Sequence, residues 1–337
     1  MHLTKFAAVA AVGLFTLLTP FRAMAQDRVV KIDGSSTVYP ITEAVAEEFQ
    51  QTAKGVKVTV GISGTGGGFK KFVRGEIDVS DASRPIQKAE AAEAAKNGIE
   101  FIELPIAFDA LTVVINKQNT WATKMTVEEL KKLWQPGEGG KGLVTKWKDI
   151  RPDWPDAKID LYGAGTDSGT FDYFTEAIVG KAKSSRTDYT ASEDDNVLVK
   201  GVEGSKNAIG YFGYAYYIAH KDRLSAVAIS WDKNPATKDA VGPAAETVIN
   251  GTYAPLSRPL FIYVNKKSLE TRPEVKQFVE FYVQKAAELS AEVKYVPLPS
   301  EAYSLVKARL DKKETGTVFG EHAVGLRIED VLKREAK

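Results

Sequence analysis

Apolar residues recur along the chain with two periods, and segments of each period alternate from residue 28 onward. Val56–Ile62 (VKVTVGI) alternates apolar and polar positions, which is typical of a strand with one buried face. Upstream of it, Ile41, Val45 and Phe49 recur at every fourth position after Pro40, which predicts a helix that the proline opens. Strands that alternate with helices in this way predict a mainly parallel sheet with helices on both faces.

Two later segments resemble each other and indicate how the chain is divided. Asp109–Asn116 (DALTVVIN) and Arg258–Asn265 (RPLFIYVN) are both β-prone runs that end in Asn, and the block between them has strand and helix patterns of its own. We therefore expect an α/β chain of two lobes joined by two crossovers. Lobe I would comprise residues 26–107 and 260–337, and lobe II residues 108–259. Two domains that follow one another along the chain are the alternative.

Aromatic residues gather in two parts of lobe II. Trp121–Trp154 includes a loop rich in Gly and Lys, and we expect it to form an excursion on the surface. Tyr211–Tyr217 (YFGYAYY) could offer a platform for a sugar, but β-prone aromatic residues of this kind also pack well in a core. We expect this second segment to be buried and β-rich.

The N-terminal residues have the composition of an export signal. Met1–Lys5 is basic, Phe6–Leu18 is apolar, and Ala23–Ala25 has the small residues of a cleavage site. The apolar run is shorter than the roughly 20 residues that a membrane span requires. We expect residues 1–25 to be a signal peptide and the mature chain to be periplasmic. A lipid anchor is not expected, because the chain has no cysteine to acylate.

Charge and residue types narrow the classes of function. Lys and Arg number 45 against 44 Asp and Glu, so the chain lacks the basic excess of a nucleic-acid binder. There is no cysteine and there are only three histidines, so we expect no metal site and no cofactor. We expect a monomer that binds no nucleic acid.

Four turns that follow predicted strands and precede predicted helices are rich in Gly, Ser and Thr. They are Gly34–Thr37, Gly64–Gly68, Asp81–Arg84 and Thr166–Thr170. A helix N-terminus presents unpaired N–H groups and a partial positive charge, glycine lets a ligand approach the backbone, and hydroxyls add donors. Any single turn is explained by ordinary capping. Together, on both sides of the expected cleft, the four turns predict a site for a small oxyanion.

Enzymatic interpretations of the same residues fit less well. Gly61–Gly68, which is followed by Phe69 and Lys70, lacks the spacing of a nucleotide-binding P-loop. Gly165–Gly169 (GTDSG) differs from the G-x-S-x-G turn that carries the nucleophile of many hydrolases. We expect a binding protein without catalytic residues. An exported phosphatase and a surface adhesin or scaffold protein are the alternatives from other classes.

Four longer motifs cover the predicted site. They are DGSSTVYPI (Asp33–Ile41), GISGTGGGFKKF (Gly61–Phe72), DVSDASRPI (Asp78–Ile86) and GTDSGTFDYF (Gly165–Phe174). With these motifs the mature chain resembles the periplasmic phosphate-binding proteins of the PstS type, which deliver phosphate to an ABC importer. The resemblance implies a type II periplasmic-binding-protein fold, phosphate as the ligand and a membrane permease as the partner. A receptor for sulfate or another tetrahedral oxyanion is the alternative.

The resemblance also implies which residues bind the ligand. The residues that match the family's motifs, or that stand in for a family residue, are Ser36, Thr37, Thr65, Ser83, Arg84, Ser168, Gly169 and Thr170. Better-known members have an arginine at the position of Ala164, and we expect Arg84 to replace it. They also have an aspartate, aligned with Ser83, that accepts the proton of phosphate and so rejects sulfate. Asp81 and Asp167 are the candidates for that role here.

Overall fold

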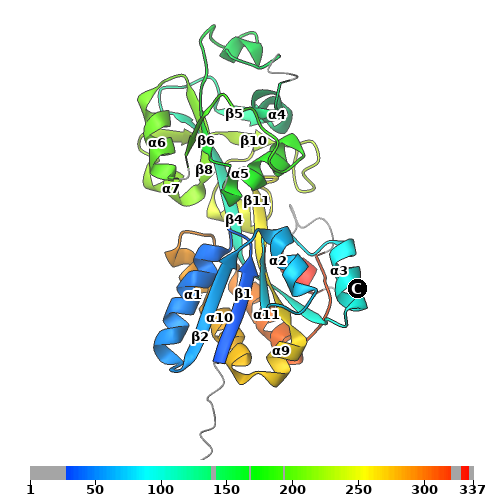
Figure 1. Cartoon of the computed structure of the whole chain (residues 1–337). Coiled ribbons are helices and arrows are strands. Elements are labelled where there is room, and N and C mark those ends of the chain that lie inside the picture. The colour runs from blue at the N-terminus through cyan, green and yellow to red at the C-terminus, as the bar shows by residue number, and fades with distance from the viewer. Residues whose placement is uncertain (1–27, 138–141, 167, 193, 320–327, 334–337) are drawn as a thin grey trace, which may run out of the picture.

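The computed structural model describes residues 28–137, 142–166, 168–192, 194–319 and 328–333. The expected signal peptide lies outside the described residues. Figure 1 shows two lobes, one above the other, with strands β4 and β11 running between them. Among the helices that the structure describes, none combines the length and hydrophobicity of a membrane span.

Lobe I is built on a sheet with the strand order β2-β1-β3-β11-β4. Its strands are β1 (Arg28–Gly34), β2 (Val56–Ile62), β3 (Val79–Ala82), β4 (Phe101–Asn116) and β11 (Ser257–Asn265). β1 lies parallel to β2 and β3, whereas β11 is antiparallel to β3 and β4. The sheet is therefore mixed, where the sequence predicted mainly parallel pairing, because β11 returns from lobe II against the direction of the other strands.

Helices cover the sheet of lobe I. They are α1 (Tyr39–Thr52), α2 (Thr65–Phe72), α3 (Lys88–Lys96), α9 (Lys266–Thr271), α10 (Pro273–Glu292), α11 (Ser300–Lys312) and α12 (Ile328–Leu332). The residues that predicted α1, Ile41, Val45 and Phe49, all lie on its buried face. The ring of Phe49 is 5.3 Å from that of Phe278, which packs α1 against α10.

Lobe II is built on the other half of β4, with the strand order β4-β8-β6-β7 and with β9 also paired to β4. Its further strands are β5 (Lys124–Thr126), β6 (Asp160–Ala164), β7 (Thr190–Ser192), β8 (Ala208–Gly213), β9 (Leu224–Ala226) and β10 (Ala228–Ser230). Its α-helices are α4 (Val127–Trp134), α5 (Gly169–Phe174), α6 (Asp195–Gly204), α7 (Tyr214–Ala219) and α8 (Ala245–Ile249). A 3₁₀ turn at Trp147–Asp149 and a π-helical turn at Thr175–Val179 complete it.

β4 connects the two lobes and changes partner along its length. In lobe I it pairs with β11 as far as Ala110, which lies opposite Ser257. From Leu111 onward it pairs with β8, beginning opposite Gly213. The lobes are thus joined by two neighbouring strands. The boundaries expected near residues 107 and 260 fall within these strands and stay predictions.

Both aromatic segments of lobe II differ from what the sequence predicted. Trp134 and Trp147, within the expected surface excursion, are completely buried. The ring of Trp134 lies 5.0 Å from that of Tyr211, so the excursion forms part of the core. The expected β-rich run ends as a strand at Gly213 and continues as helix α7, where Tyr216 is 38% exposed. The strand ends where its partner β4 passes to β11, since Gly213 lies opposite Leu111 and the preceding Ala110 pairs with Ser257.

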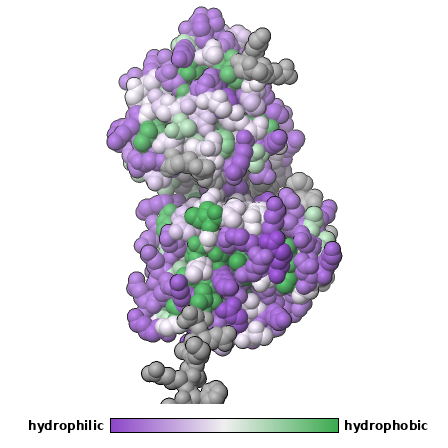
Figure 2. Space-filling view, viewed as in Figure 1, coloured by the Kyte–Doolittle hydropathy of each residue, from purple (hydrophilic) through white to green (hydrophobic). Residues whose placement is uncertain are grey.

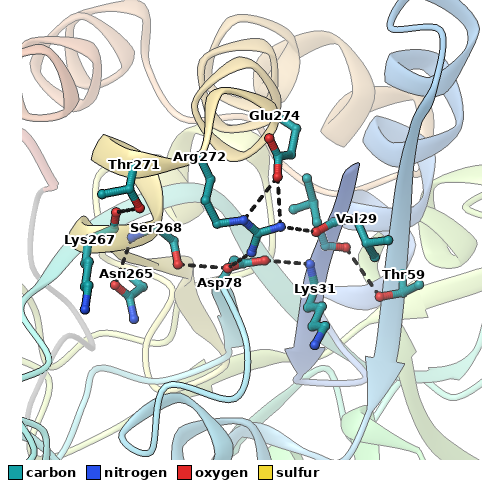
Figure 3. Close-up of polar contacts among 11 residues, drawn as sticks. Val29, Lys31, Thr59, Asp78, Asn265, Lys267, Ser268, Thr271, Arg272 and Glu274 are labelled. Atoms are coloured by element: carbon teal, nitrogen blue, oxygen red, sulfur yellow. Dashed lines mark hydrogen bonds and ion pairs between the residues drawn. The ribbon is translucent and has the colours of Figure 1, made fainter. Parts of the chain in front are cut away.

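A buried carboxylate ties the start of β3 to the helices that follow β11 (Figure 3). Asp78 accepts hydrogen bonds from the Lys31 backbone N–H (2.9 Å), the Ser268 hydroxyl (2.8 Å) and Arg272 Nη1 (2.6 Å). Arg272 also binds Glu274 and the Val29 carbonyl. This network joins segments that are distant in the sequence, so it stabilises the closure of lobe I.

Removing the cation of this network should destabilise the protein. We expect Arg272→Met to lower the free energy of unfolding by about 2–3 kcal/mol, since it leaves the buried Asp78 carboxylate without its ion pair. The value lies below that of a fully buried pair because the Arg272 side chain is 33% exposed. Urea unfolding of the two proteins measures the difference.

The matched control is Lys276→Met in the first turn of α10, the helix that Arg272 immediately precedes. The Lys276–Glu280 ion pair is exposed, 56% and 47% for the two side chains, and its loss should change the stability by less than about 0.5 kcal/mol. Equal unfolding midpoints for the two variants would show that the Asp78 network contributes no more than a surface pair.

Candidate functional site: the cleft between the lobes

The first Gly/Ser/Thr turn, between β1 and α1, is fixed by its backbone contacts. Ser35 N–H donates to the Asp81 carbonyl (3.0 Å), and the Thr37 carbonyl accepts from the Tyr295 hydroxyl (2.7 Å). Gly34, at φ +146°, lies so close to β3 that a Cβ would be 2.1 Å from the Asp81 carbonyl oxygen. The turn therefore requires glycine at this position and has little freedom to move.

The second turn, which is rich in glycine, contacts both the first and the third turn. α2 begins at Thr65, and a Cβ on Gly68 would lie 2.6 Å from the Cα of Gly34, so glycine lets this helix press against the first turn. The Thr65 hydroxyl accepts a hydrogen bond from Ser83 N–H (3.1 Å) and lies 3.1 Å from the Ser83 hydroxyl. Two of the predicted ligand hydroxyls are thus in direct contact.

Arg84, expected to bind the anion, has a carboxylate partner within its own lobe. Its two Nη atoms donate to the Glu90 carboxylate at 2.9 and 2.8 Å. Glu90 is in turn fixed by the Gln87 N–H (2.8 Å), and the Arg84 guanidinium lies 5.4 Å from the centre of the Phe69 ring. The fork of the guanidinium that would suit an oxyanion is occupied in this structure.

The turn in lobe II lies between β6 and α5. The Ser168 hydroxyl accepts a hydrogen bond from Thr170 N–H (3.1 Å) and so caps α5, which begins at Gly169. Asp167, one of the two candidate proton acceptors, lies outside the described residues. The serine of this turn, which predicted the start of a helix, therefore serves as the N-cap of α5.

A cavity of about 590 Å³ lies between the lobes. Ser83, Arg84 and Lys88 line it from lobe I, Glu176 lines it from lobe II, and Arg258 lines it from crossover strand β11. The lining therefore offers guanidinium donors to an anion, although Arg84 is paired with Glu90 and Arg258 with Asp109. Figure 2 shows the waist between the lobes at the level of the cleft.

A second, smaller cavity of about 120 Å³ is lined by Asp109 and Ala110 of β4, by Thr170 and by Tyr295. Thr170 of lobe II therefore lies at a cavity that the crossover strand also lines. Thr37 of lobe I lies 3.5 Å from Arg258, measured from its hydroxyl to Nη2. Ser36 stays partly exposed beside the buried Thr37.

Two charged residues of this region were not singled out in the sequence. Arg258 and Asp109 lie opposite each other on the crossover strands, with Nε 3.5 Å from Oδ2. Both side chains are largely buried, at 8% and 14% exposure. The available signal was that each of the two similar β-prone segments opens with a charged residue, which is unusual for a strand that is otherwise apolar.

Asp81, the other candidate proton acceptor, lies in the core of lobe I. It is completely buried, and neither carboxyl oxygen has a hydrogen-bond partner among the described residues. Burial raises the pKa of Asp81 to about 8; the neighbouring Asp33 also raises it, and the Thr42 hydroxyl lowers it. The structure therefore does not bring Asp81 to either cavity, since its carboxyl is directed among core residues such as Thr42 and Tyr282.

Comparison with known proteins places the chain in a family. The model of the PBP (periplasmic binding protein) superfamily domain matches residues 22–286. Phosphate-binding protein PstS of Staphylococcus saprophyticus is 38% identical over 84% of this chain and 84% of its own length. The chain belongs to the PstS group of the PBP superfamily. Protein SphX of Synechococcus elongatus is 49% identical over 99% of this chain and 95% of that protein.

Solved structures agree with this assignment. A possible phosphate binding protein from Planctomyces limnophilus is 52% identical with a TM-score of 0.78, covering 84% of this PstS-group chain and 98% of that chain. An ABC-type phosphate transport receptor from Vibrio cholerae, 23% identical, has a TM-score of 0.61 over 80% of this chain and 99% of that chain, and so shares the fold. The expected periplasmic-binding-protein fold and the resemblance to the PstS type are confirmed.

Proposed function

We propose that this chain is a phosphate receptor of the periplasm that binds its ligand reversibly between two lobes and passes it to the permease of an ABC importer. It acts as a binding protein and not as an enzyme, as a monomer, after export by the signal peptide at residues 1–25. The names of its relatives support phosphate as the ligand, since they describe phosphate-binding and phosphate-transport proteins.

One observation carries the proposal: one predicted Gly/Ser/Thr turn of each lobe lies at a cavity beside the crossover strands. Ser83 and Arg84 line one cavity together with Arg258, and Thr170 lines the other together with Asp109. Hydroxyl and backbone donors next to buried basic groups are what a dehydrated oxyanion requires.

The size of the cleft supports a closing movement. A cavity of about 590 Å³ has room for much more than a five-atom anion, so closure of the lobes would bring more of its walls into contact with phosphate. An anion that contacts both lobes only after closure will shift the population toward the closed form. The two crossover strands are the elements about which the lobes would rotate.

Calorimetric titration of the mature protein, freed of bound ligand, tests the proposal. Phosphate should bind with a 1:1 stoichiometry, and sulfate at the same concentration should give no heat beyond dilution. Sulfate binding as tight as that of phosphate would favour the oxyanion alternative. Silence with both anions would contradict the proposal.

The Arg84–Glu90 pair gives a second test. We expect Arg84→Ala to lower phosphate affinity by about tenfold, because it removes a positive charge from the cavity while Glu90 remains. Glu90→Gln should raise the affinity several-fold, because it frees the Arg84 fork for the anion. The same calorimetric titration measures both variants. An unchanged affinity in Arg84→Ala would show that the guanidinium takes no part in binding.

A further inference from the structure

Helix α7 of lobe II buries none of its residues, although most of them are aromatic or aliphatic (YAYYIA). Tyr216 and Ile218 on this helix are 38% and 41% exposed. Figure 1 shows α7 at the edge of lobe II that faces lobe I. Isolated apolar side chains are common on protein surfaces, but a helix without a buried residue gains stability from any further surface that covers it. We therefore looked for a surface that could cover α7.

A loop of lobe I, residues 293–296 after helix α10, lies opposite α7. Tyr216 and this loop line the same cavity of about 120 Å³, each from its own lobe. Burial raises the pKa of Tyr295 in the loop, and Asp195 and Tyr216 of lobe II are among the groups that raise it further. The loop and α7 are therefore close neighbours across the boundary between the lobes.

Backbone contacts fix the loop in place. Phe108 N–H of β4 donates to the Val296 carbonyl (2.8 Å), and Val296 N–H donates to the Phe108 carbonyl (3.1 Å). Tyr295 N–H donates to the Ser290 carbonyl at the end of α10 (2.8 Å). Between these contacts Lys294 is held at φ +74°, which is uncommon for a residue with a Cβ. The loop is therefore a preformed surface that needs no further ordering to receive another one.

The positions of the predicted ligand turns give the direction of movement. The Tyr295 hydroxyl donates to the Thr37 carbonyl (2.7 Å), so the loop is attached to the first turn of lobe I. Thr170 of the lobe II turn lines the same cavity as the loop. A ligand that draws Thr170 toward Thr37 therefore narrows this cavity. Lys294 lines it from lobe I and Asp195 from lobe II, and their opposite charges also favour approach.

We propose that α7 and the loop of residues 293–296 form a closing contact between the lobes, in which Tyr216 packs on the loop when the ligand binds. The closing contact does not touch the ligand, and it stabilises the closed form by burying apolar surface. It therefore raises the affinity for phosphate without changing the preference among anions. The inference rests on the proposed function, because it requires a ligand that draws the lobes together.

Calorimetric titration of Tyr216→Ala with phosphate tests the contribution of the closing contact. We expect a loss of affinity of about tenfold, because less apolar surface is buried on closure. Ile218→Ala is the matched control, since Ile218 is as exposed on the same helix but does not line the cavity. Its affinity should equal that of the wild type. Competition by sulfate should be the same in all three proteins, and thermal unfolding shows that each is folded.

A cross-link between the two walls of the cavity tests the movement itself. The chain has no cysteine, so Tyr216→Cys combined with Lys294→Cys places a single thiol on each lobe. A disulfide requires Cα atoms within about 7 Å of each other. We expect saturating phosphate to speed disulfide formation several-fold under mild oxidation, because it brings α7 to the loop. Ile218→Cys combined with Lys294→Cys is the control, and phosphate should not change its rate.

The outcomes separate this inference from the proposed function. Where the wild type binds phosphate, the function stands. An unchanged affinity in Tyr216→Ala, or a cross-linking rate that phosphate does not change, would then overturn the closing contact and leave α7 as a surface for another protein. An equal loss of affinity in Ile218→Ala would also overturn it, since the effect would belong to the helix as a whole. A wild type that does not bind phosphate would overturn both proposals.

Discussion

Replacing Gly34 with alanine is expected to lower the free energy of unfolding by about 3 kcal/mol or more. Two costs combine at this position. The backbone has φ +146°, which residues with a Cβ rarely adopt, and the added Cβ would lie 2.1 Å from the Asp81 carbonyl oxygen. Because that oxygen belongs to a strand in the middle of the sheet, it cannot move aside without breaking the Ser35–Asp81 hydrogen bond.

Gly55→Ala separates the two costs. Gly55 has a positive φ of +78°, but nothing lies within 4 Å of the position that its Cβ would occupy. Alanine there should cost only the backbone strain, about 1–2 kcal/mol. Urea unfolding curves of the two variants measure the difference, and phosphate titration shows whether the first turn still binds. A Gly34→Ala protein as stable as Gly55→Ala would mean that β1 and β3 are not packed as closely as described.

Replacing Asp81 with asparagine is expected to stabilise the protein at pH 8 and to leave its stability unchanged at low pH. Burial raises the pKa of Asp81 to about 8, against about 3.9 in an unfolded chain. Between these two values the unfolded chain releases the proton and the folded chain keeps it, so stability falls as pH rises through this window. Below about pH 4 both states hold the proton, and the contribution disappears.

The variant should therefore gain about 5 kcal/mol over the wild type at pH 8 and about 1 kcal/mol at pH 4.5. Denaturant midpoints at pH 4.5, 6 and 8 measure this difference, and other titrating groups cancel in the comparison. Phosphate affinity of Asp81→Asn should equal that of the wild type, because the carboxyl lies in the core and not at a cavity. A parallel pH dependence in both proteins would contradict a neutral Asp81, and a loss of phosphate selectivity would return it to the list of proton acceptors.

Local patterns predicted much of the fold and part of the site. The strand Val56–Ile62 and the helix from Pro40 were predictable because the residues of each element repeat with the period of its own geometry. The four turns were predictable because Gly, Ser and Thr are needed where a strand ends and a helix begins. The contact between Thr65 and Ser83 follows from such turns at one edge of the sheet, after β2 and β3, which lie on either side of β1.

The rest depends on pairing between distant segments. Arg258 and Asp109 meet because β11 lies against β4, and no local pattern gives the register of strands 149 positions apart. Arg84 forms an ion pair with Glu90, a residue in the first turn of α3. A comparison of motifs does not reveal this pairing. Trp134 is buried because α4 packs on the π-helical turn of lobe II, although a loop rich in Gly and Lys follows it in the sequence.

The central claim is that phosphate binds between the lobes, in contact with both, and a crystal structure of the mature protein with phosphate tests it most directly. We expect one tetrahedral anion in the cleft, with oxygens within hydrogen-bond distance of the first turn of lobe I near Thr37 and of the lobe II turn at Ser168–Thr170. The lobes should lie closer together than in the structure described here. An anion held by one lobe alone, or a cleft without phosphate at a saturating concentration, would contradict the account.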